Sequence, residues 1–322
     1  MTDYTRLPKI ELHVHLDGSV RLETASELLD RNINEVKYEM IAKEKCEDLN
    51  AYLTKFELPV MVMQTSRNLE RVAYELAVDM KNDGVLYAEV RFAPSKHILE
   101  GLSLYDVVES VIMGLRRVDL KTNVILCMMR DDSLEANMKV IDTARHYLNN
   151  GVCAVDLAGA EAIYKTEDFR ELFEYSKEKK VPFTIHAGEA DGRESIKSAI
   201  DFGTSRIGHG VNIITEEDLI KEVINKNILL EVCPTSNIQT RVVDSYKNHP
   251  IKKLYDMDVP ISINTDNRTV SNTTLRKEYQ HLENSLGFTI DDFIKINKMA
   301  IEHAFISEIE KKELLNKFNS LL

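Results

Sequence analysis

Residues 66–92 read SRNLERVAYELAVDMKNDGVLYAEVRF. The first part is an amphipathic helical pattern that opens at Ser66 and runs to Gly84, and glycine is the residue that most readily takes the positive φ at a helix C-terminus. Val85–Phe92 follows at once and is rich in the apolar and aromatic residues of a buried strand. A helix that leads directly into a strand is typical of a sheet whose parallel strands are joined by crossover helices.

This unit recurs along the whole chain. Three helix starts resemble capping boxes: Ser103-x-x-Asp106, Thr215-x-x-Asp218 and Thr289-x-x-Asp292. Eight candidate strands lie between the helical patterns: Lys9–Leu16, Val85–Phe92, Asn123–Arg130, Cys153–Leu157, Pro182–Ala187, Arg206–Gly210, Ile228–Cys233 and Val259–Asn264. Eight strands that alternate with helices predict an α/β fold, a closed (β/α)₈ barrel of the TIM type, as a single catalytic domain over residues 1–322.

The interval between the first two strands is the longest. Residues 17–84 hold at least two helical patterns, one of them over Leu49–Gln64. We expect these extra helices, inserted after the first strand, to lie over the top of the barrel as a lid. A doubly wound open sheet is the main alternative fold, but no G-x-G-x-x-G follows the first candidate strand.

Composition excludes several classes of protein. The chain has 322 residues, and 41 Lys and Arg against 53 Asp and Glu give a net charge of −12, whereas nucleic-acid binding needs clustered positive charge. The chain contains no apolar run of about 18 residues, so no membrane span is predicted. Met1–Lys9 lacks the apolar segment of a secretory signal. The four cysteines are far apart, which is typical of reduced thiols. We therefore expect a cytoplasmic protein with no nucleic-acid or membrane partner, and the sequence leaves its oligomeric state open.

Histidines and carboxylates gather at the C-terminal ends of the candidate strands, where a barrel places its active site. His13-x-His15 ends the first strand, and residues two apart on a strand point to the same side. His186 ends the fifth strand and Asp266 follows the eighth, which completes a set of three nitrogen ligands and one oxygen ligand. This set suits a catalytic Zn²⁺ ion, because it contains no thiolate and leaves room for water. We expect one zinc ion per chain.

Two further residues lie at strand ends. Glu189 comes three residues after His186, in a glycine-containing turn. A carboxyl group there can either stabilise the N-terminus of the next helix or transfer a proton beside a metal. His209, which lies between Gly208 and Gly210, is either a hydrogen-bonding group next to the metal or a core histidine. Spacing alone does not separate these alternatives.

At these residues the sequence resembles the adenosine deaminases of the amidohydrolase superfamily. Six segments match motifs of that family in the family's order, between about Leu7 and about His303: Pro8–Ser19, Asp156–Glu161, His186–Glu189, Arg206–Gly210, Cys233–Asn237 and Asn264–Asn267. The resemblance implies a zinc-dependent (β/α)₈ hydrolase that acts on a cyclic amidine C–N bond. Its partner would be a small purine nucleoside, and it would convert adenosine or 2′-deoxyadenosine to inosine and ammonia.

The resemblance also implies roles for the matching residues. Glu189 would protonate N1 of the purine, His209 would hold the attacking hydroxide, and Asp266 would take up its proton. His15 would face the substrate in addition to binding the metal. The implied zinc ligands are the set found above: His13, His15, His186 and Asp266.

The implied substrate contacts include one departure from the family pattern. Asp17 would contact the ribose 5′-hydroxyl, the Gly159 backbone N–H would contact N3, and Asn267 would face N7. Many family members have a second Asp in place of Asn267, but an amide donates to N7 without needing a proton. Arg268, where Pro is frequent, and Ala160, where an acid is frequent, also differ. Deaminases of adenine or of modified nucleosides therefore stay alternatives.

Two other classes of function fit part of the pattern. A hydrolase of amides or phosphoesters on the same scaffold often uses two metals with a bridging Lys or Glu at the fourth strand, but that strand ends in Asp156-Leu-Ala-Gly159. A catalytically inactive nucleoside-binding protein would not need the four candidate ligands and Glu189 together. Nucleobase deaminases of the H-x-E and P-C-x-x-C type are excluded, since the chain lacks two closely spaced cysteines.

Overall fold

The computed structural model describes residues 4–322, so residues 1–3 of the Met1–Lys9 segment lie outside the described residues. Eight strands follow one another along the chain: β1 (Lys9–His15), β2 (Val85–Phe92), β3 (Lys121–Met129), β4 (Val152–Ala158), β5 (Ile185–Ala187), β6 (Arg206–His209), β7 (Leu229–Val232) and β8 (Ile261–Ile263). They pair in parallel in two four-stranded sheets, with the orders β1-β2-β3-β4 and β5-β6-β7-β8. The predicted α/β fold with parallel strands is confirmed.

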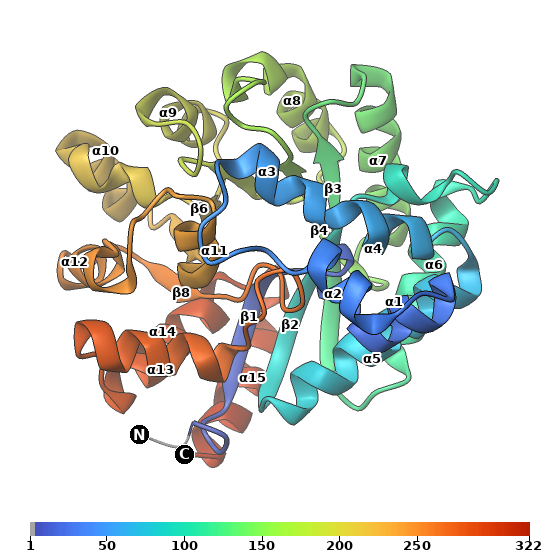
Figure 1. Ribbon diagram of the computed structural model, residues 1–322. Coiled ribbons are helices and arrows are strands. Elements are labelled where there is room, and N and C mark those ends of the chain that lie inside the picture. The colour runs from blue at the N-terminus through green and yellow to red at the C-terminus, as the bar shows by residue number, and fades with distance from the viewer. Residues whose placement is uncertain (1–3) are drawn as a thin grey trace.

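The edges of the two sheets are linked. Val155 of β4 forms a parallel bridge with Phe183, just before β5, and Val14 of β1 forms one with Asp266, just after β8. The backbone N–H of His15 donates to the Asp266 carbonyl oxygen at 2.6 Å. Figure 1 shows the strands at the centre of the molecule and the helices around them. The ends of the first and last strands therefore lie side by side.

Helices join consecutive strands, as the sequence pattern predicts. Those between β1 and β2 are α1 (Leu22–Leu29), α2 (Ile33–Met40), α3 (Leu49–Leu53), α4 (Glu57–Val62) and α5 (Ser66–Asn82). The next connections contain α6 (Leu104–Arg116), α7 (Leu134–Tyr147), α8 (Arg170–Glu178), α9 (Arg193–Asp201), α10 (Glu217–Asn225), α11 (Pro234–Gln239) and α12 (Ile251–Asp256). After β8 come α13 (Leu275–Leu286), α14 (Ile290–His303) and α15 (Glu308–Ser320).

Helix α5 illustrates how the sequence builds the core. Its buried apolar residues recur every three or four positions, so that one face of the helix packs against the rest of the protein: Leu69, Val72, Ala73, Leu76 and Met80. The helix begins at Ser66 as predicted, although the side chain that caps it belongs to Thr65. Gly84 has a φ of +83°, and a Cβ there would lie 3.1 Å from the Thr5 carbonyl oxygen, so this turn needs glycine.

The helical pattern over Leu49–Gln64 does not form one helix. It is divided into α3, a 3₁₀ turn at Thr54–Phe56, and α4. Pro59 explains the division, because proline has no N–H and in a continuous α-helix its ring would clash with the carbonyl of Lys55. The prediction of one helix here was therefore wrong.

The predicted capping boxes have different outcomes. Those that begin at Ser103 and Thr289 are present with both of their hydrogen bonds. The one predicted at Thr215 was wrong, because α10 has no side-chain cap. Asp218, the expected partner of Thr215, instead pairs with Arg193 at 2.6 Å.

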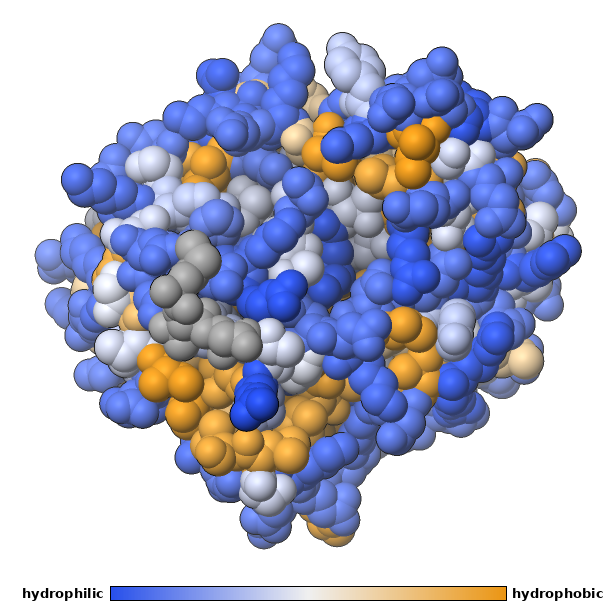
Figure 2. All heavy atoms as spheres, turned by 60° about the horizontal axis from the view of Figure 1, so that its bottom comes forward, coloured by the Kyte–Doolittle hydropathy of each residue, from blue (hydrophilic) through white to orange (hydrophobic). Residues whose placement is uncertain are grey.

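The surface shown in Figure 2 is mostly hydrophilic, with separate hydrophobic areas. Among residues 4–322, no helix is both long and apolar enough to cross a membrane. All four cysteines are buried in the interior.

Candidate active site

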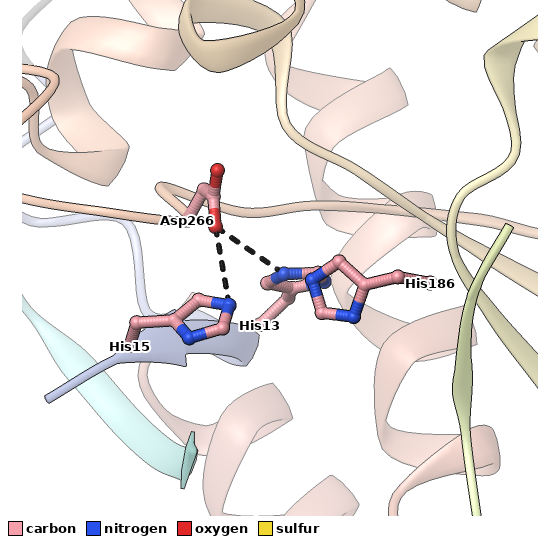
Figure 3. A group of neighbouring side chains, drawn as sticks. All are labelled: His13, His15, His186 and Asp266. Carbon is pink, nitrogen blue, oxygen red and sulfur yellow. Dashed lines mark ion pairs between the residues drawn. The ribbon is translucent and has the colours of Figure 1, made fainter. Parts of the chain in front are cut away.

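The four candidate metal ligands meet at the C-terminal ends of the strands. His13 and His15 extend from β1, His186 extends from β5, and Asp266 follows β8 (Figure 3). One nitrogen or oxygen atom from each side chain lies within 4.8 Å of those from the other three. Asp266 Oδ1 is 3.4 Å from the Nε2 atoms of both His13 and His15. The fold therefore brings together the residues that the sequence pattern singled out.

His13 has the orientation of a metal-binding imidazole. Its Nδ1 lies 2.9 Å from Glu231 Oε2, and a hydrogen bond donated to this carboxylate leaves the lone pair on Nε2. The buried Nε2 atom has no hydrogen-bond partner among residues 4–322. A buried polar atom without a partner costs about 1–3 kcal/mol, so this atom is suited to a ligand from outside the chain. Three imidazoles and one carboxylate fit a cation that prefers nitrogen and oxygen donors.

Two buried carboxylates hold the histidine ligands from behind. Asp156 Oδ2 lies 2.9 Å from His186 Nδ1, as Glu231 lies beside His13. The Arg91 guanidinium joins the two carboxylates, at 2.8 Å from Asp156 and 2.7 Å from Glu231. The side chains of Arg91, Asp156 and Glu231 are 0% exposed. We call these three residues, together with Arg206 and Glu89, the buried charge network.

Arg206 extends this network away from the metal ligands. It contacts Glu231 at 2.6 Å and Glu89 at 2.5 Å. Burial would raise the pKa of Glu231, but the guanidinium groups of Arg206 and Arg91 hold that pKa well below its usual value. Glu231 is therefore ionised and accepts the proton of the imidazole that faces it.

The sequence patterns assigned no role to Arg91, Arg206, Glu89 or Glu231. Each belongs to a strand, and its charged partners lie on other strands far away in the chain. The available signal was the charge itself. Parallel strands are usually buried on both faces, so a charged residue in the middle of one must be paired.

Glu189 is buried beside the metal-ligand cluster. Thr240 Oγ1 donates to its Oε1 at 3.3 Å, and His209 Nε2 lies 3.4 Å from its Oε2. Burial, with the nearby carboxylates of Asp266 and Glu161, raises the pKa of Glu189 well above its usual value. A carboxyl group whose pKa is raised keeps its proton to a higher pH, which suits a general acid.

Glu161 organises the turn that carries Glu189. Its carboxylate accepts hydrogen bonds from a series of backbone N–H groups, those of Gly188 (2.6 Å), Glu189 (3.0 Å), Ala190 (2.7 Å) and Asp191 (3.2 Å). It also accepts one at 2.5 Å from the hydroxyl of Ser195. Glu161 ends the matched segment Asp156–Glu161, but the sequence patterns assigned it no role.

Two of the predicted functional residues have a left-handed backbone. The φ angle is 60° at His209 and 59° at Asp266. Such a conformation costs a non-glycine residue about 1–3 kcal/mol, and it persists where the surrounding structure enforces it, often at functional sites. Here it turns both side chains towards the cluster at the strand ends.

Asp17, one of the residues predicted to contact substrate, lies beside this cluster. Asp17 Oδ1 is 3.9 Å from His15 Nδ1, and burial raises the pKa of Asp17 to about 7. Gly159 directly follows β4 and has a φ of +104°, a conformation that favours glycine.

The two departures from the family pattern after Asp266 are both held by neighbours. Asn267 Nδ2 donates to the hydroxyl of Tyr52, on α3, at 2.8 Å. Arg268 pairs with Glu11 at 3.4 Å and with Asp83 at 3.2 Å. Arg268 thereby ties the loop after β8 to β1 and to the end of α5.

Comparison with known proteins identifies the family. Residues 8–321 match the family described as adenosine deaminase. The adenosine deaminase of Shewanella woodyi is 42% identical to the chain, over 97% of the chain and 98% of that protein. The chain belongs to the adenosine deaminase family. The resemblance found in the six sequence motifs, and with it the prediction of an adenosine deaminase, is confirmed.

Solved structures of other deaminases and amidohydrolases share the fold of this adenosine deaminase family member. The N6-mAMP deaminase MAPDA of Arabidopsis has a TM-score of 0.88 and 27% identity, over 98% of each chain. An amidohydrolase of Burkholderia ambifaria, solved with bound Zn, has a TM-score of 0.88 and 22% identity, over 99% of this chain and 92% of that one.

Proposed function

We propose that the chain hydrolyses adenosine, and 2′-deoxyadenosine, to inosine and ammonia at the cluster of His13, His15, His186 and Asp266. One observation carries the proposal: a set of metal-binding side chains lies beside a buried carboxyl, that of Glu189, whose pKa is raised. Hydrolytic deamination needs both an activated water and a proton donor. Family membership supports adenosine as the substrate.

The finer architecture is part of the proposal. The eight strands close into one (β/α)₈ barrel that forms a single domain, and the bridges Val14–Asp266 and Val155–Phe183 support closure. The helices between β1 and β2 cover the site as a lid. The hydrogen bond between Asn267 and Tyr52 of α3 supports this arrangement.

Zn²⁺ is the metal that suits this cluster best, with one ion per chain. The ligands would be His13 Nε2, one nitrogen each of His15 and His186, and Asp266. Three imidazoles and a carboxylate without thiolates are typical of catalytic zinc. When bound, Zn²⁺ lowers the pKa of water from 15.7 to about 7 and thereby supplies a nucleophile at neutral pH.

The protein's own side chains move the protons. Attack at C6 disrupts the aromatic purine ring, and charge builds on N1 unless a proton arrives there. Glu189 holds such a proton and donates it to N1. Burial would raise the pKa of Asp266, but its contacts with His13 and His15 lower that pKa, so Asp266 is an ionised carboxylate that can take the proton of the attacking water. Asp266 then passes this proton to the 6-amino group, which leaves as ammonia, and the proton of the new C6 hydroxyl returns to Glu189 as the carbonyl forms. His209 hydrogen-bonds the attacking oxygen.

Three residues orient the nucleoside. Asp17 binds the ribose 5′-hydroxyl, the Gly159 N–H binds N3, and Asn267 donates to N7 with the amide hydrogen that Tyr52 does not use. A 5′-phosphate would face the carboxyl group of Asp17. The site therefore favours a nucleoside over a nucleotide.

The test is an absorbance assay, because loss of the 6-amino group changes the purine spectrum. Adenosine and 2′-deoxyadenosine should be turned over, and adenine, AMP and N6-methyl-AMP should be poor substrates. Preference for either nucleotide would contradict the proposal.

Elemental analysis should find one zinc ion per chain, and full activity in metal-free protein would contradict the role of zinc. A cytoplasmic location stays a prediction.

A further inference from the structure

A chain of hydrogen bonds runs from the start of α12 to His209. The Ile251 backbone N–H donates to His249 Nδ1 at 3.1 Å. His249 Nε2 lies 3.3 Å from Asn237 Oδ1, and Asn237 Nδ2 lies 3.0 Å from His209 Nδ1. At the inner end, His209 Nε2 lies 3.4 Å from Glu189 Oε2. The three side chains between the two ends are buried.

The backbone N–H of Ile251 decides the direction of this chain, because it can only donate. His249 Nδ1 must accept, so in the neutral ring the proton is on Nε2. Burial lowers the pKa of His249 to about 3, which keeps the ring neutral at pH 7. His249 Nε2–H therefore donates to Asn237 Oδ1, and this turns the amide nitrogen of Asn237 towards His209. If the Asn237 amide were turned the other way, its NH₂ group would face the Nε2–H of His249, and two donors would point at each other.

We propose that Asn237 and His249 are positioning residues that hold His209 as the tautomer with its proton on Nε2. His209 then presents a hydrogen-bond donor to the reacting atoms and to Glu189. It has no lone pair on that nitrogen with which to accept a proton. The proton of the attacking water is therefore taken up by Asp266, and His209 is not the base. The effect on rate rests on the proposed function, but the tautomer does not.

The direct test is NMR spectroscopy of the zinc-loaded protein with ¹⁵N-labelled histidine. Long-range ¹H–¹⁵N correlations distinguish the two ring nitrogens, and a His209→Gln variant identifies the signals of His209. We expect an unprotonated Nδ1 and a protonated Nε2. A protonated Nδ1 in the wild-type protein would overturn the proposal. Because this readout needs no turnover, wild-type protein that fails to deaminate adenosine would refute the proposed function while leaving the tautomer testable.

Asn237→Asp tests the consequence for catalysis. Aspartate has nearly the same shape but no N–H, so a neutral His209 ring must donate from Nδ1 and carries no proton on Nε2. We expect the NMR pattern to invert and kcat to fall about 10²–10³-fold, the usual effect of losing one donor that stabilises the transition state. KM should change far less. An inverted pattern with wild-type kcat would contradict the inference.

His249 offers a matched pair of variants. His249→Gln keeps a carbonyl for the Ile251 N–H and an N–H for Asn237, whereas His249→Leu keeps neither, so the Gln variant should retain more activity. His249 also lines a surface cavity of about 640 Å³, so added imidazole should restore part of kcat in His249→Ala. Equal losses in the Gln and Leu variants, with no response to imidazole, would show that His249 only fills space.

Discussion

Glu161 accepts a hydrogen bond from the backbone N–H of Glu189 at 3.0 Å, and its side chain is almost completely buried. The same carboxylate accepts from the N–H groups of the adjacent turn residues and from the Ser195 hydroxyl. All of these partners are donors. The buried Glu161 carboxylate thus fixes the position of Glu189, the proposed proton donor.

Glu161→Gln should destabilise the protein and slow the reaction. The new side-chain NH₂ group must face N–H groups, and a buried donor left without an acceptor costs about 1–3 kcal/mol. Denaturant unfolding and kcat should both report the change, with the metal content unaltered. Glu167→Gln, an exposed glutamate in the same connection, is the control. Equal behaviour of the two variants would contradict this role for Glu161.

Glu189→Gln separates chemistry from structure. The amide keeps the size of the side chain but cannot transfer a proton, so kcat should fall about 10²–10⁴-fold, the usual range for general acid–base catalysis. This corresponds to roughly 3–5 kcal/mol at about 1.36 kcal/mol per tenfold change. Zinc content should not change, and Glu194→Gln on α9 is the exposed control. Wild-type kcat with a lowered Tm would leave Glu189 a purely structural role.

Asp156→Asn should weaken metal binding. This carboxylate lies against His186, and loss of such a partner typically costs 10–100-fold in metal affinity. Competition with a chelator measures the change. Glu89→Gln is the matched control, because Glu89 belongs to the buried charge network but touches none of the candidate ligands. Glu89→Gln should lower the stability of the protein and leave its metal affinity unchanged. If both variants bind the metal as the wild type does, Asp156 does not support the site.

Glu278 should make stability depend on pH. Burial raises the pKa of this side chain on α13 from 4.5 to about 7. Between these values the folded protein holds a proton that the unfolded chain has released, so the free energy of unfolding falls as pH rises through this window, by at most about 1.4 kcal/mol per pH unit. Glu278→Gln should reduce this slope. Denaturant unfolding at several pH values measures it, and identical slopes in the two proteins would refute the assignment.

The strands and candidate ligands were predictable because their signals are local. A buried parallel strand is a short apolar run between helices, and the side chains at its C-terminal end point to a shared centre. Thus His13, His186 and Asp266 could be grouped before their distances were known. Whether they bind metal stays a prediction.

The other features of the site and the fold were not predictable, because they depend on contacts between residues that are distant in the sequence. Arg91 and Glu231 are 140 positions apart, and each looks like an isolated exception in an apolar strand. Asn237 and His249 are linked through a hydrogen bond that requires the loop before α12. Asp218 had the right spacing for a capping box, but Arg193, a partner 25 residues away, binds it instead. No local pattern records such competition.

The buried charge network has a consequence for how the site acquires its metal. His13 and His186 are oriented by Glu231 and Asp156, which are both paired with Arg91, so the positions of the two histidines are determined by the chain itself. Folding would then not wait for the metal, unlike the folding of a zinc finger, and loading of the site would be a late event. A metal site that is formed before any ion binds accepts whichever suitable divalent ion reaches it. Co²⁺ or Mn²⁺ would meet the same ligands as Zn²⁺. The identity of the resident ion would then follow its supply in the cell as much as the geometry of the protein.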